Sequence, residues 1–585
     1  MIVGIDLGTS TSELAVLRNG VPTVVREIAG SSHGFLPSVV ALGTDGQLRV
    51  GEAAVALLAV RPEASVAEVK RLMGTDQRVV LGSETFTPQE ISALILRHLK
   101  QEAETALGET IDRAVITVPA YFTALQRRAT HDAGELAGLT VQRLINEPTA
   151  AALAYGIERP NAEEKVLVYD LGGGTFDVTV LELSEGVLDV IASTGNSALG
   201  GKDFDERLMA FLAATCREAT GVDLMASPKL RARLRGAAKR AKEDLSNARS
   251  TPIVVDEWEY DLTRAAFEAQ IEDLVHSTAQ QIDEALAKKQ LKPAQIDTIL
   301  MIGGSSRVPF VRAFVSHYFG DRPLRTEVHP DEAVALGAAV LGGIESNAIH
   351  PGAIVITDVA PWTLGVAVQE HRHGRALSGV FSPLIEKQST IPRSVTRHYG
   401  TSHDWQATIL VEVYQGDAML CTNNLKVGEF ELLLAERAPA GADVEISFSY
   451  NLNGELEVVA SALGASRRVV MRPSPQHMSD QEKQVARDRL EKKWAAQAPL
   501  AGNTAGEAMT PATTSLVERA RHSPLYPRVA ALLAKAEQLL PTLPAGPRTR
   551  LDVLLLELRT GLIANDERAV GIVEQAITNL LVEPS

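Results

Sequence analysis

Short apolar runs alternate with helical stretches through the N-terminal part of the chain. The runs 111–118 and 165–169 are rich in branched apolar residues and have the length of strands, whereas 124–137 and 204–218 repeat apolar residues at helical spacing. Alternation of this kind is typical of a domain in which helices cover a largely parallel sheet. We therefore predict an α/β domain over residues 1–346.

The pattern changes in the segment 347–361, NAIHPGAIVITDVAP. Helix breakers lie on both sides of its apolar run 354–356, which is typical of a linker that can dock as an edge strand. Short alternating strands follow over 362–475, with NLNGE at 451–455 as a hairpin turn. The sequence therefore predicts a linker and then an all-β domain.

Helical spacing returns over residues 476–585. Ser479 begins the sequence Ser-Asp-Gln-Glu, a capping box that would start a helix. The stretch 497–527 begins with small, polar and nearly uncharged residues, and we expect it to be flexible. Three later segments have apolar residues at helical spacing and predict a small bundle: 528–540, 548–562 and 566–582.

The composition limits the classes of partner. The 585 residues include 57 Lys and Arg against 73 Asp and Glu, which gives a net charge of −16. Because the chain is acidic and has no long basic block, we expect neither nucleic acid nor a membrane surface as a partner. The first residues lack the basic region of a signal peptide, the apolar stretches are too short to span a bilayer, and the two cysteines, Cys216 and Cys421, are far apart. We expect a cytoplasmic protein.

Two glycine turns each join one predicted strand to another. They lie in IDLGTS (5–10) and YDLGGGTFD (169–177), whereas the Walker A loop and the dinucleotide fingerprint lead into a helix and need glycine spacings that are absent here. Glycines in such turns let backbone N–H groups approach an anion closely, and a neighbouring hydroxyl adds a donor. We expect the two turns to face each other and to bind a polyphosphate through Gly8, Thr9, Ser10, Gly172, Gly173, Gly174 and Thr175.

A third glycine turn, GGSSR at 303–307, also follows a predicted strand. Its residues suit a nucleoside, because Ser305 can bind a ribose and Arg307 can stack on a base. A Gly-Gly pair by itself is more often only a tight turn. Three such turns in one chain favour nucleotide binding over that structural explanation. We expect the third turn to bind the nucleoside through Gly303, Gly304, Ser305 and Arg307.

Three aspartates lie beside the two phosphate turns. Asp6, Asp170 and Asp177 would repel a phosphate unless a cation lies between the charges. Mg²⁺ prefers oxygen ligands of this kind and keeps several of its waters. The sequence therefore predicts Mg²⁺ held by these carboxylates, directly or through water.

The turns and several further segments resemble the DnaK-type chaperones, the seventy-kilodalton heat-shock family. The similar segments are VKRLMG at 69–74, TVPAYFTALQRRATHDAGELAGL at 117–139, RLINEPTAAALAYG at 143–156, LGGKDFD at 199–205 and HPDEAVALGAAVLGG at 329–343. QSTIPRS and VEVYQGD extend the resemblance through the strand-rich region. It implies a multidomain protein: an α/β ATPase domain with the two lobes and duplicated ribonuclease H-like fold of actin and hexokinase, then an antiparallel β-sandwich, then a small α-helical region.

The resemblance implies an ATPase site that binds ATP or ADP with Mg²⁺, and K⁺ is a further candidate ion. Lys70, Glu147, Asp170 and Thr175 would be catalytic, with Lys70 acting on the γ-phosphate and the carboxylates positioning or activating the attacking water. Asp6 and Asp177 would hold the hydrated Mg²⁺. Phosphoryl transfer needs mainly positioning and charge neutralisation, which these residue types supply. Without the resemblance, Lys70 would be interpreted as a solvated lysine on a helix.

The resemblance places five further residues around the nucleoside and its phosphates: Gly200, Lys239, Lys242, Ser246 and Asp331. Lys239 stands where the family usually has Glu, and this difference bears on nucleotide affinity and exchange. Lys202 stands where an acidic residue is common, with no effect assigned.

In the strand-rich region the resemblance implies a cleft for extended apolar segments of unfolded polypeptides. The matching positions are Val366, Val368, Tyr399, Ile409 and Val411. Alternating Val and Ile are equally typical of an ordinary sandwich core. Polar residues at Gln369, Ser402 and Glu455 depart from the family, so we expect a weaker or differently selective cleft.

The resemblance also assigns the linker and a partner surface. Ile354, Val355, Ile356 and Asp358 would dock on the ATPase domain when ATP binds and so open the cleft. Thr357 stands where a Leu is typical, which suggests weaker docking. A J-domain partner would bind where Arg143, Asn146, Thr149 and Asp358 lie, although Arg143 is equally explained as a surface charge.

We therefore predict an ATP-dependent molecular chaperone, most similar to the HscC-like subgroup because the helical lid is short. Two alternatives remain from the sequence. One is a nucleotide-exchange or holding factor with weak hydrolysis, and the other is a small-molecule kinase or filament-forming ATPase on the same fold. Clients, the J-protein and any exchange factor stay undefined.

Overall fold

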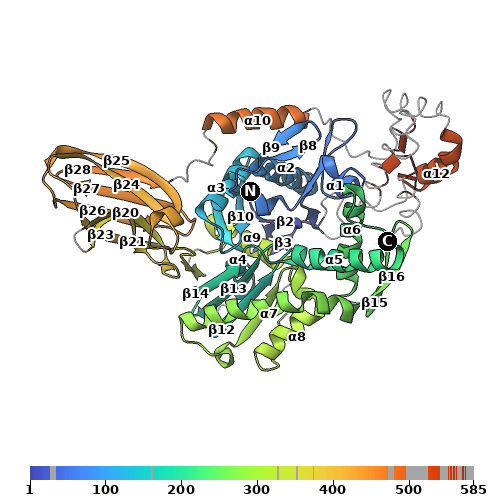
Figure 1. Cartoon of the computed structure of the whole chain (residues 1–585), viewed down its shortest axis with the longest axis horizontal. Coiled ribbons are helices and arrows are strands. Elements are labelled where there is room, and N and C mark those ends of the chain that lie inside the picture. Colours follow the sequence, from blue (N-terminus) through green and yellow to red (C-terminus); the bar gives the residue numbers. More distant parts are fainter. Residues whose placement is uncertain are drawn as a thin grey trace.

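The computed structural model (Figure 1) describes most of the chain. The described residues are 1–26, 34–58, 60–157, 159, 162–325, 329–350, 354–372, 375–471, 478, 480–495, 525–540 and separate positions between 548 and 577.

The first sheet is six-stranded, in the order β11-β10-β1-β2-β3 with β4 also paired to β2. Its strands are β1 (Ile2–Leu7), β2 (Thr11–Arg18), β3 (Val21–Val24), β4 (Leu36–Pro37), β10 (Arg113–Val118) and β11 (Thr140–Asn146). β1 and β2 form an antiparallel hairpin, while β10 runs parallel to β1 and β11 parallel to β10. Helices α2 (Pro88–Leu107) and α3 (Ala124–Leu136) share the apolar core of this sheet.

The second sheet repeats this arrangement, in the order β17-β12-β13-β14-β18. Its strands are β12 (Glu164–Leu171), β13 (Phe176–Ser184), β14 (Val187–Asn196), β17 (Thr298–Ile302) and β18 (Val355–Ile356). β12 and β13 form an antiparallel hairpin, and β17 runs parallel to β12. Helices α5 (Gly201–Thr220), α6 (Pro228–Asp244), α7 (Arg264–Lys288) and α8 (Pro309–Tyr318) cover it, and their apolar residues share one core.

Helices α4 (Glu147–Gly156) and α9 (Ala333–Glu345) lie between the two sheets (Figure 1), and their side chains share a core with both. Small residues let these backbones approach closely. A Cβ on Gly337 of α9 would lie 1.7 Å from the carbonyl oxygen of Ala150 in α4, and a Cβ on Gly4 of β1 would lie 2.1 Å from the amide nitrogen of Ala339. The predicted α/β architecture is therefore present, with α4 and α9 as its central layer.

Smaller elements border the two sheets. They are β5 (Val39–Leu42), β6 (Leu48–Val50), α1 (Glu52–Leu58), η1 (Pro62–Ala64), β7 (Ser65–Ala67), η2 (Val69–Leu72), β8 (Val79–Leu81), β9 (Glu84–Phe86), β15 (Ser250–Val255), β16 (Trp258–Thr263), η3 (Pro293–Gln295) and η4 (Gly304–Arg307). Two of them, η2 and η4, carry residues of the site described below.

Two four-stranded antiparallel sheets form the strand-rich unit, in the orders β21-β20-β24-β25 and β23-β26-β27-β28. The strands are β20 (Leu364–Arg372), β21 (Arg375–Ile385), β23 (Arg393–Gly400), β24 (Gln406–Gln415), β25 (Leu425–Ala438), β26 (Asp443–Tyr450), β27 (Leu456–Ala462) and β28 (Ala465–Met471), with the short pair β19 (Asp358–Val359) and β22 (Thr390–Ile391) and the turn η5 (Cys421–Asn423) beside them. Apolar residues of both sheets share one core. The predicted hairpin turn closes where Asn451 N donates to Glu455 O at 3.1 Å.

The C-terminal region contains α10 (Asp480–Ala495) and α12 (Tyr526–Leu539). The flexible segment predicted over 497–527 is wrong at its end, because Tyr526 and Pro527 already belong to α12. Proline fits the first turn of a helix, where its missing N–H has no intrahelical acceptor. Residues 497–524 and the predicted cap Ser479 lie outside the described residues.

Buried apolar positions between Val529 and Ile577 form one cluster, as expected for the predicted bundle. Among the described residues, no helix is long and apolar enough to cross a membrane.

We expect Gly337→Ala to lower the stability of the α/β part by about 2–3 kcal/mol, because the new methyl group overlaps the α4 backbone. Scanning calorimetry would measure the loss. Gly236→Ala in α6 is the matched control, since its Cβ meets only the end of the Arg240 side chain at 3.4 Å. Equal melting temperatures for the two variants would contradict the expectation.

Candidate functional site

The two predicted phosphate turns lie against each other. A Cβ on Gly173 would lie 2.2 Å from Ser10 Oγ, and a Cβ on Gly174 would lie 2.7 Å from the Thr9 side chain. Gly172 N closes the second turn by donating to Thr175 O at 3.1 Å. The two turns therefore face each other, as the sequence predicted, and Gly173 and Gly174 leave room for that close approach. Binding of a phosphate by these glycines stays a prediction.

The third turn and the start of α5 join the second turn. Ser305 Oγ donates to Gly172 O at 2.9 Å, and the same carbonyl accepts from Gly201 N at 2.9 Å. A Cβ on Gly200 would lie 2.6 Å from Gly174 N. Gly303 has a positive φ of 79°, and a Cβ there would lie 2.5 Å from the carbonyl oxygen of Leu171. The structure therefore brings all three predicted turns to one place.

The predicted nucleoside residues of α6 lie beside the start of α5. Lys242 Nζ donates to Gly201 O at 3.0 Å and forms an ion pair with Asp205 at 2.7 Å. Ser246 Oγ donates to Lys242 O at 3.3 Å. Lys239 is exposed and lies 4.0 Å from Glu243, one turn further along α6.

The remaining nucleoside residues follow β17. Arg307 forms an ion pair with Asp331, and its Nη2 lies 3.0 Å from His329 Nε2. A Cβ on Gly304 would lie 3.5 Å from Asp331 Oδ1. Arg307 is thus held next to the third turn, and nearly half of its side chain is exposed.

Lys70 is buried on η2, where its ammonium forms an ion pair with Glu147, the first residue of α4. Asp6 at the end of β1 accepts a 2.6 Å hydrogen bond from Thr117 Oγ1. Asp170 and Asp177 lie opposite each other on the β12–β13 hairpin, and Asp177 Oδ2 accepts from a backbone amide at 3.1 Å. Of the predicted catalytic and metal residues, Lys70, Glu147, Asp170 and Asp177 are buried, while Asp6 and Thr175 are partly buried.

The carboxylates of this group repel one another. Burial, together with the neighbouring carboxylates, raises the pKa of Asp6, Glu147 and Asp170, and raises that of Asp177 to about 7. Burial alone would lower the pKa of Lys70, but attraction to Glu147 and Asp6 outweighs it and raises the value. One lysine cannot balance four neighbouring carboxylates, three of them buried, so the residues fit a divalent cation such as Mg²⁺.

Sequence reasoning missed Glu13, which lies opposite Asp6 on the β1–β2 hairpin. Its carboxyl is buried and has no hydrogen bond within the described structure. Burial and the nearby charges of Asp6, Glu332 and Asp331 raise its pKa to about 10. A charged residue at an inward position of a strand was the signal that could have revealed it.

Two further contacts join the η2 segment to the second turn and α5. Arg71 Nη2 donates to Gly174 O at 2.7 Å and forms a 2.6 Å ion pair with Asp203. Lys202 lies 2.9 Å from Glu68, which immediately precedes η2 and has a positive φ of 59°. This ion pair gives a structural reason for a lysine at position 202, where the family commonly has an acidic residue. We call the four residues that make these contacts, 68, 71, 202 and 203, the clasp.

The linker is docked as the predicted edge strand. β18 pairs in parallel with β14, where Ile354 is buried and Val355 is half exposed. Thr357 Oγ1 donates to Asp189 beside this strand, so threonine contributes a bond that leucine could not make.

Asp358 connects the linker to α4. Its Oδ2 accepts hydrogen bonds of 2.9 Å from both Asn146 Nδ2 and Thr149 Oγ1. All three side chains are buried, whereas Arg143 forms a partly exposed 2.8 Å ion pair with Glu345. The predicted linker and partner residues therefore lie together, and of the four partner residues Arg143 is the one that is partly open to solvent.

The strand-rich unit contacts the α/β part on both sides of the linker. Ala124 N donates to Gln415 Oε1 at 3.2 Å, and Ser193 N donates to Gln388 Oε1 at 2.9 Å. The rings of Tyr121 and Trp362 meet edge to face at 5.3 Å.

The predicted cleft residues divide into two groups. Val366, Ile409 and Val411 are buried in the core shared by the two sheets, while Val368 and Tyr399 are partly buried at its edge. A peptide-binding role for them stays a prediction.

Comparisons with known proteins agree with this geometry. The family model described as Hsp70 protein matches residues 2–81 and 76–521. The chain is 42% identical over 498 residues to "Chaperone protein DnaK" of Thermosipho melanesiensis, covering 82% of this chain and 81% of that protein. It is also 42% identical over 493 residues to "Chaperone protein DnaK" of Thermotoga maritima, covering 81% and 80%.

The chain belongs to the Hsp70 family. The predicted DnaK-type chaperone family is thus confirmed, and with it an ATP-dependent chaperone that hydrolyses ATP. The exchange-factor, kinase and filament alternatives are not favoured. The HscC-like subgroup stays a prediction.

We expect Arg71→Ala to speed ADP release about tenfold, because it removes two charge-assisted contacts of the clasp. Stopped-flow release of a fluorescent ADP would measure it. Arg207→Ala removes an exposed 2.7 Å ion pair with Asp273, between two helices that cover the same sheet, and is the matched control. The same release rate in both variants would show that the clasp does not hold the nucleotide site closed.

Proposed function

We propose that this Hsp70-family chaperone switches the affinity of its strand-rich unit for unfolded polypeptides through the first turn of α4. That turn supports the proposal because its residues contact both Lys70 of the predicted catalytic group and Asp358 of the linker. Glu147 is paired with Lys70 in the nucleotide site, while Asn146 and Thr149 bind Asp358 of the linker. A change in charge around Glu147 therefore acts on residues next to the linker contact.

The nucleotide would lie along the three turns. Backbone amides of the first two turns and the Thr9, Ser10 and Thr175 hydroxyls would bind phosphates, and the third turn with Lys242, Ser246, Arg307 and Asp331 would bind the nucleoside. Gly200 would keep the backbone of α5 close to the phosphates. Lys239 would take part only by approaching the ribose.

Lys70 would bind the γ-phosphate by leaving its pairing with Glu147. Glu147, together with Asp170, would then orient the attacking water and accept a hydrogen bond from it. Asp6, Asp170 and Asp177 would hold hydrated Mg²⁺, which neutralises phosphate charge when it is bound. K⁺ remains a further candidate ion.

We further propose the domain division predicted from the sequence: an ATPase domain over 1–346, a linker over 347–361, a substrate domain over 362–475 and a helical region over 476–585. The two similar sheets around α4 and α9 support the two-lobed, duplicated ribonuclease H-like fold of actin and hexokinase. The shared core of the two antiparallel sheets supports a sandwich. α10 and the C-terminal cluster are consistent with a short, HscC-like lid.

Client segments would bind in the strand-rich unit near Val368 and Tyr399, which border its core. Val366, Ile409 and Val411 would become available only when the two sheets separate at that edge. A J-domain partner would meet Arg143 directly, and would reach Asn146, Thr149 and Asp358 only after the linker leaves.

We expect ATP to speed the release of a fluorescent client peptide, and Asp358→Ala to abolish that effect while nucleotide still binds. The variant leaves the Asn146 and Thr149 donors without their linker acceptor. Peptide release and ATP hydrolysis would be measured together, with and without ATP.

Asp443→Ala is the control, because its exposed carboxylate pairs with His398 on the neighbouring strand of the strand-rich unit. Trp362 fluorescence reports whether the linker moves, since the ring packs on Tyr121. If ATP binds to wild-type protein but peptide release does not change, the linker does not transmit the signal and the holding-factor alternative returns.

We expect Lys70→Met to slow ATP hydrolysis by at least about a hundredfold with little loss of ATP binding, because the charge is needed mainly as the γ-phosphate is transferred. Single-turnover hydrolysis and equilibrium binding would be compared. Lys100→Met, at a partly exposed lysine 3.9 Å from Glu104, is the control. A rate in Lys70→Met within a few fold of wild type would remove Lys70 from the catalytic group.

A further inference from the structure

Helix α10 lies on α2 and α3 (Figure 1), at a distance along the chain from both. Ala486 and Leu490 are buried in the core of the first sheet. Arg489 and Lys493 form ion pairs with Glu90 and Glu84. Apolar burial and charge therefore both hold α10 in place.

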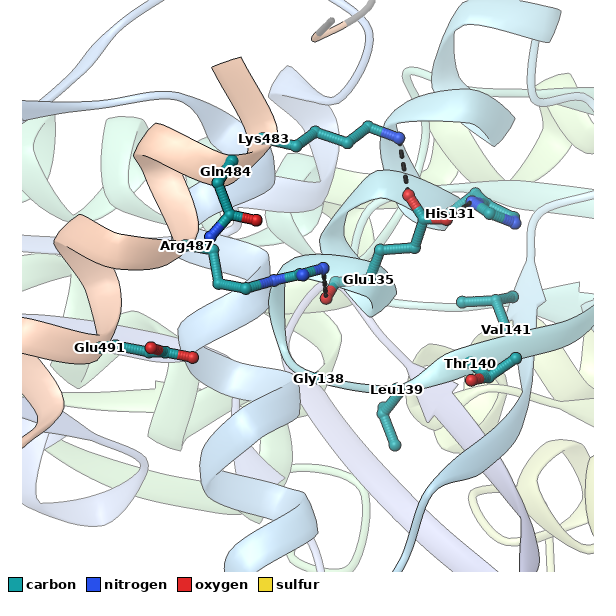
Figure 2. Close-up of a pocket in the computed structure, with 10 residues that line it drawn as sticks. All are labelled: His131, Glu135, Gly138, Leu139, Thr140, Val141, Lys483, Gln484, Arg487 and Glu491. Carbon is teal, nitrogen blue, oxygen red and sulfur yellow. Dashed lines mark hydrogen bonds and ion pairs between the residues drawn. The ribbon is translucent and has the colours of Figure 1, made fainter. Parts of the chain in front are cut away.

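A third ion-pair group lies at the N-terminal end of this contact. Lys483 of α10 places its ammonium 2.6 Å from Asp132 Oδ1 and 2.6 Å from Glu135 Oε2, both of α3. Figure 2 shows Lys483, Glu135 and His131 around the opening of a cavity between the two helices. The ligand atoms of His131, Asp132 and Glu135 all lie within 4.8 Å of one another.

This group has the composition of a transition-metal site. An imidazole and two carboxylates are a usual donor set for Zn²⁺, and His131 and Glu135 are four residues apart on one face of α3. Two ligands of a tetrahedral zinc ion lie about 3.5 Å apart. The side chains would need to approach by only about an ångström, which their rotatable bonds allow.

His131 and Asp132 are held by charge rather than by hydrogen bonds. His131 Nδ1 is buried, lies 3.8 Å from Glu135 Oε1 and has no hydrogen bond in the described part of the chain. Asp132 is 1% exposed, and its oxygens meet Lys483 and Arg128 (3.0 Å) as ion pairs without hydrogen-bonding geometry. The buried carboxylate therefore faces two cations, and the Lys483 ammonium is the one that comes from α10.

We propose that His131, Asp132 and Glu135 bind a first-row transition-metal dication such as Zn²⁺, and that the ion takes the place of the Lys483 ammonium. The two would compete, because both bind the carboxylates of Asp132 and Glu135 and their positive charges repel each other. The adjoining cavity, of about 810 Å³, admits the ion and leaves room for its water ligands. His131 and Glu135 both line that cavity.

Exclusion of Lys483 links the metal to the position of α10. A ligand that binds only when Lys483 has left must weaken the docking of α10, and docking must weaken the ligand by the same factor. The site would thus let a metal ion release the lid helix independently of the nucleotide. It does not rest on the mechanism proposed for α4.

Calorimetric titration of the full-length protein with ZnSO₄, at saturating Mg²⁺ and ADP, tests the proposal. We expect one Zn²⁺ equivalent that is lost, or weakened at least tenfold, in Asp132→Asn and in His131→Ala. Lys483→Met should bind that equivalent at least tenfold more tightly, because the competing ammonium is gone. This gain of affinity cannot arise from misfolding.

Two substitutions serve as matched controls. His317→Ala removes an exposed histidine that also lies four residues from an acid, Asp321, and Lys492→Met removes an exposed charge from α10 itself. Both should bind Zn²⁺ like wild type. Hydrogen exchange should show that Zn²⁺ reduces the protection of residues 480–495 in wild type and has no such effect in Asp132→Asn.

Unchanged Zn²⁺ binding in Asp132→Asn and His131→Ala would overturn the site. Equal affinity in Lys483→Met and wild type would overturn the exchange between metal and lysine, and with it the release of α10.

Discussion

The first turn of α4 is the point on which the rest of the molecule depends, because two buried polar networks meet there. Glu147 is paired with Lys70 on the nucleotide side, and Asn146 and Thr149 hold Asp358 on the linker side. Removing one partner of a buried ion pair costs about 3–5 kcal/mol, whereas the intact pair adds little net stability. The pair is thus better suited to sense a change in its surroundings than to stabilise the fold.

The arrangement of the two sheets is consistent with the role proposed for this turn. Each sheet supplies one glycine turn, and α4 lies in the layer between them with α9. Cβ atoms at Gly173 and Gly174 would overlap the Ser10 and Thr9 side chains of the opposite turn, so the glycines allow the two turns to lie close together. The buried carboxylates around that space carry more negative charge than Lys70 offsets. The clasp contacts of Arg71 and Lys202 join the two halves beside this space.

Several features were predictable because they depend on local pattern. The hairpins around the first two turns follow from apolar strands separated by glycine, and the docked strand at 355–356 follows from an apolar run between breakers. The limits of the C-terminal helix were less certain, since Tyr526 and Pro527 lie within α12 although composition suggested a flexible segment. Roles for Lys70 and Glu147 came from family resemblance, because neither residue is distinctive in its own neighbourhood.

The amino-acid sequence by itself determined the order of α/β, linker, strand-rich and helical regions, the three glycine turns and the family, because apolar spacing and short motifs are properties of neighbouring residues. Only the tertiary structure decided which charges meet. The pairing of Arg71 with Asp203, the buried Glu13 beside Asp6 and the seating of Lys483 on Asp132 each join residues of separate elements. Whether a charge is buried, paired or left open to a ligand depends on packing across the whole chain, and no local pattern carries that information.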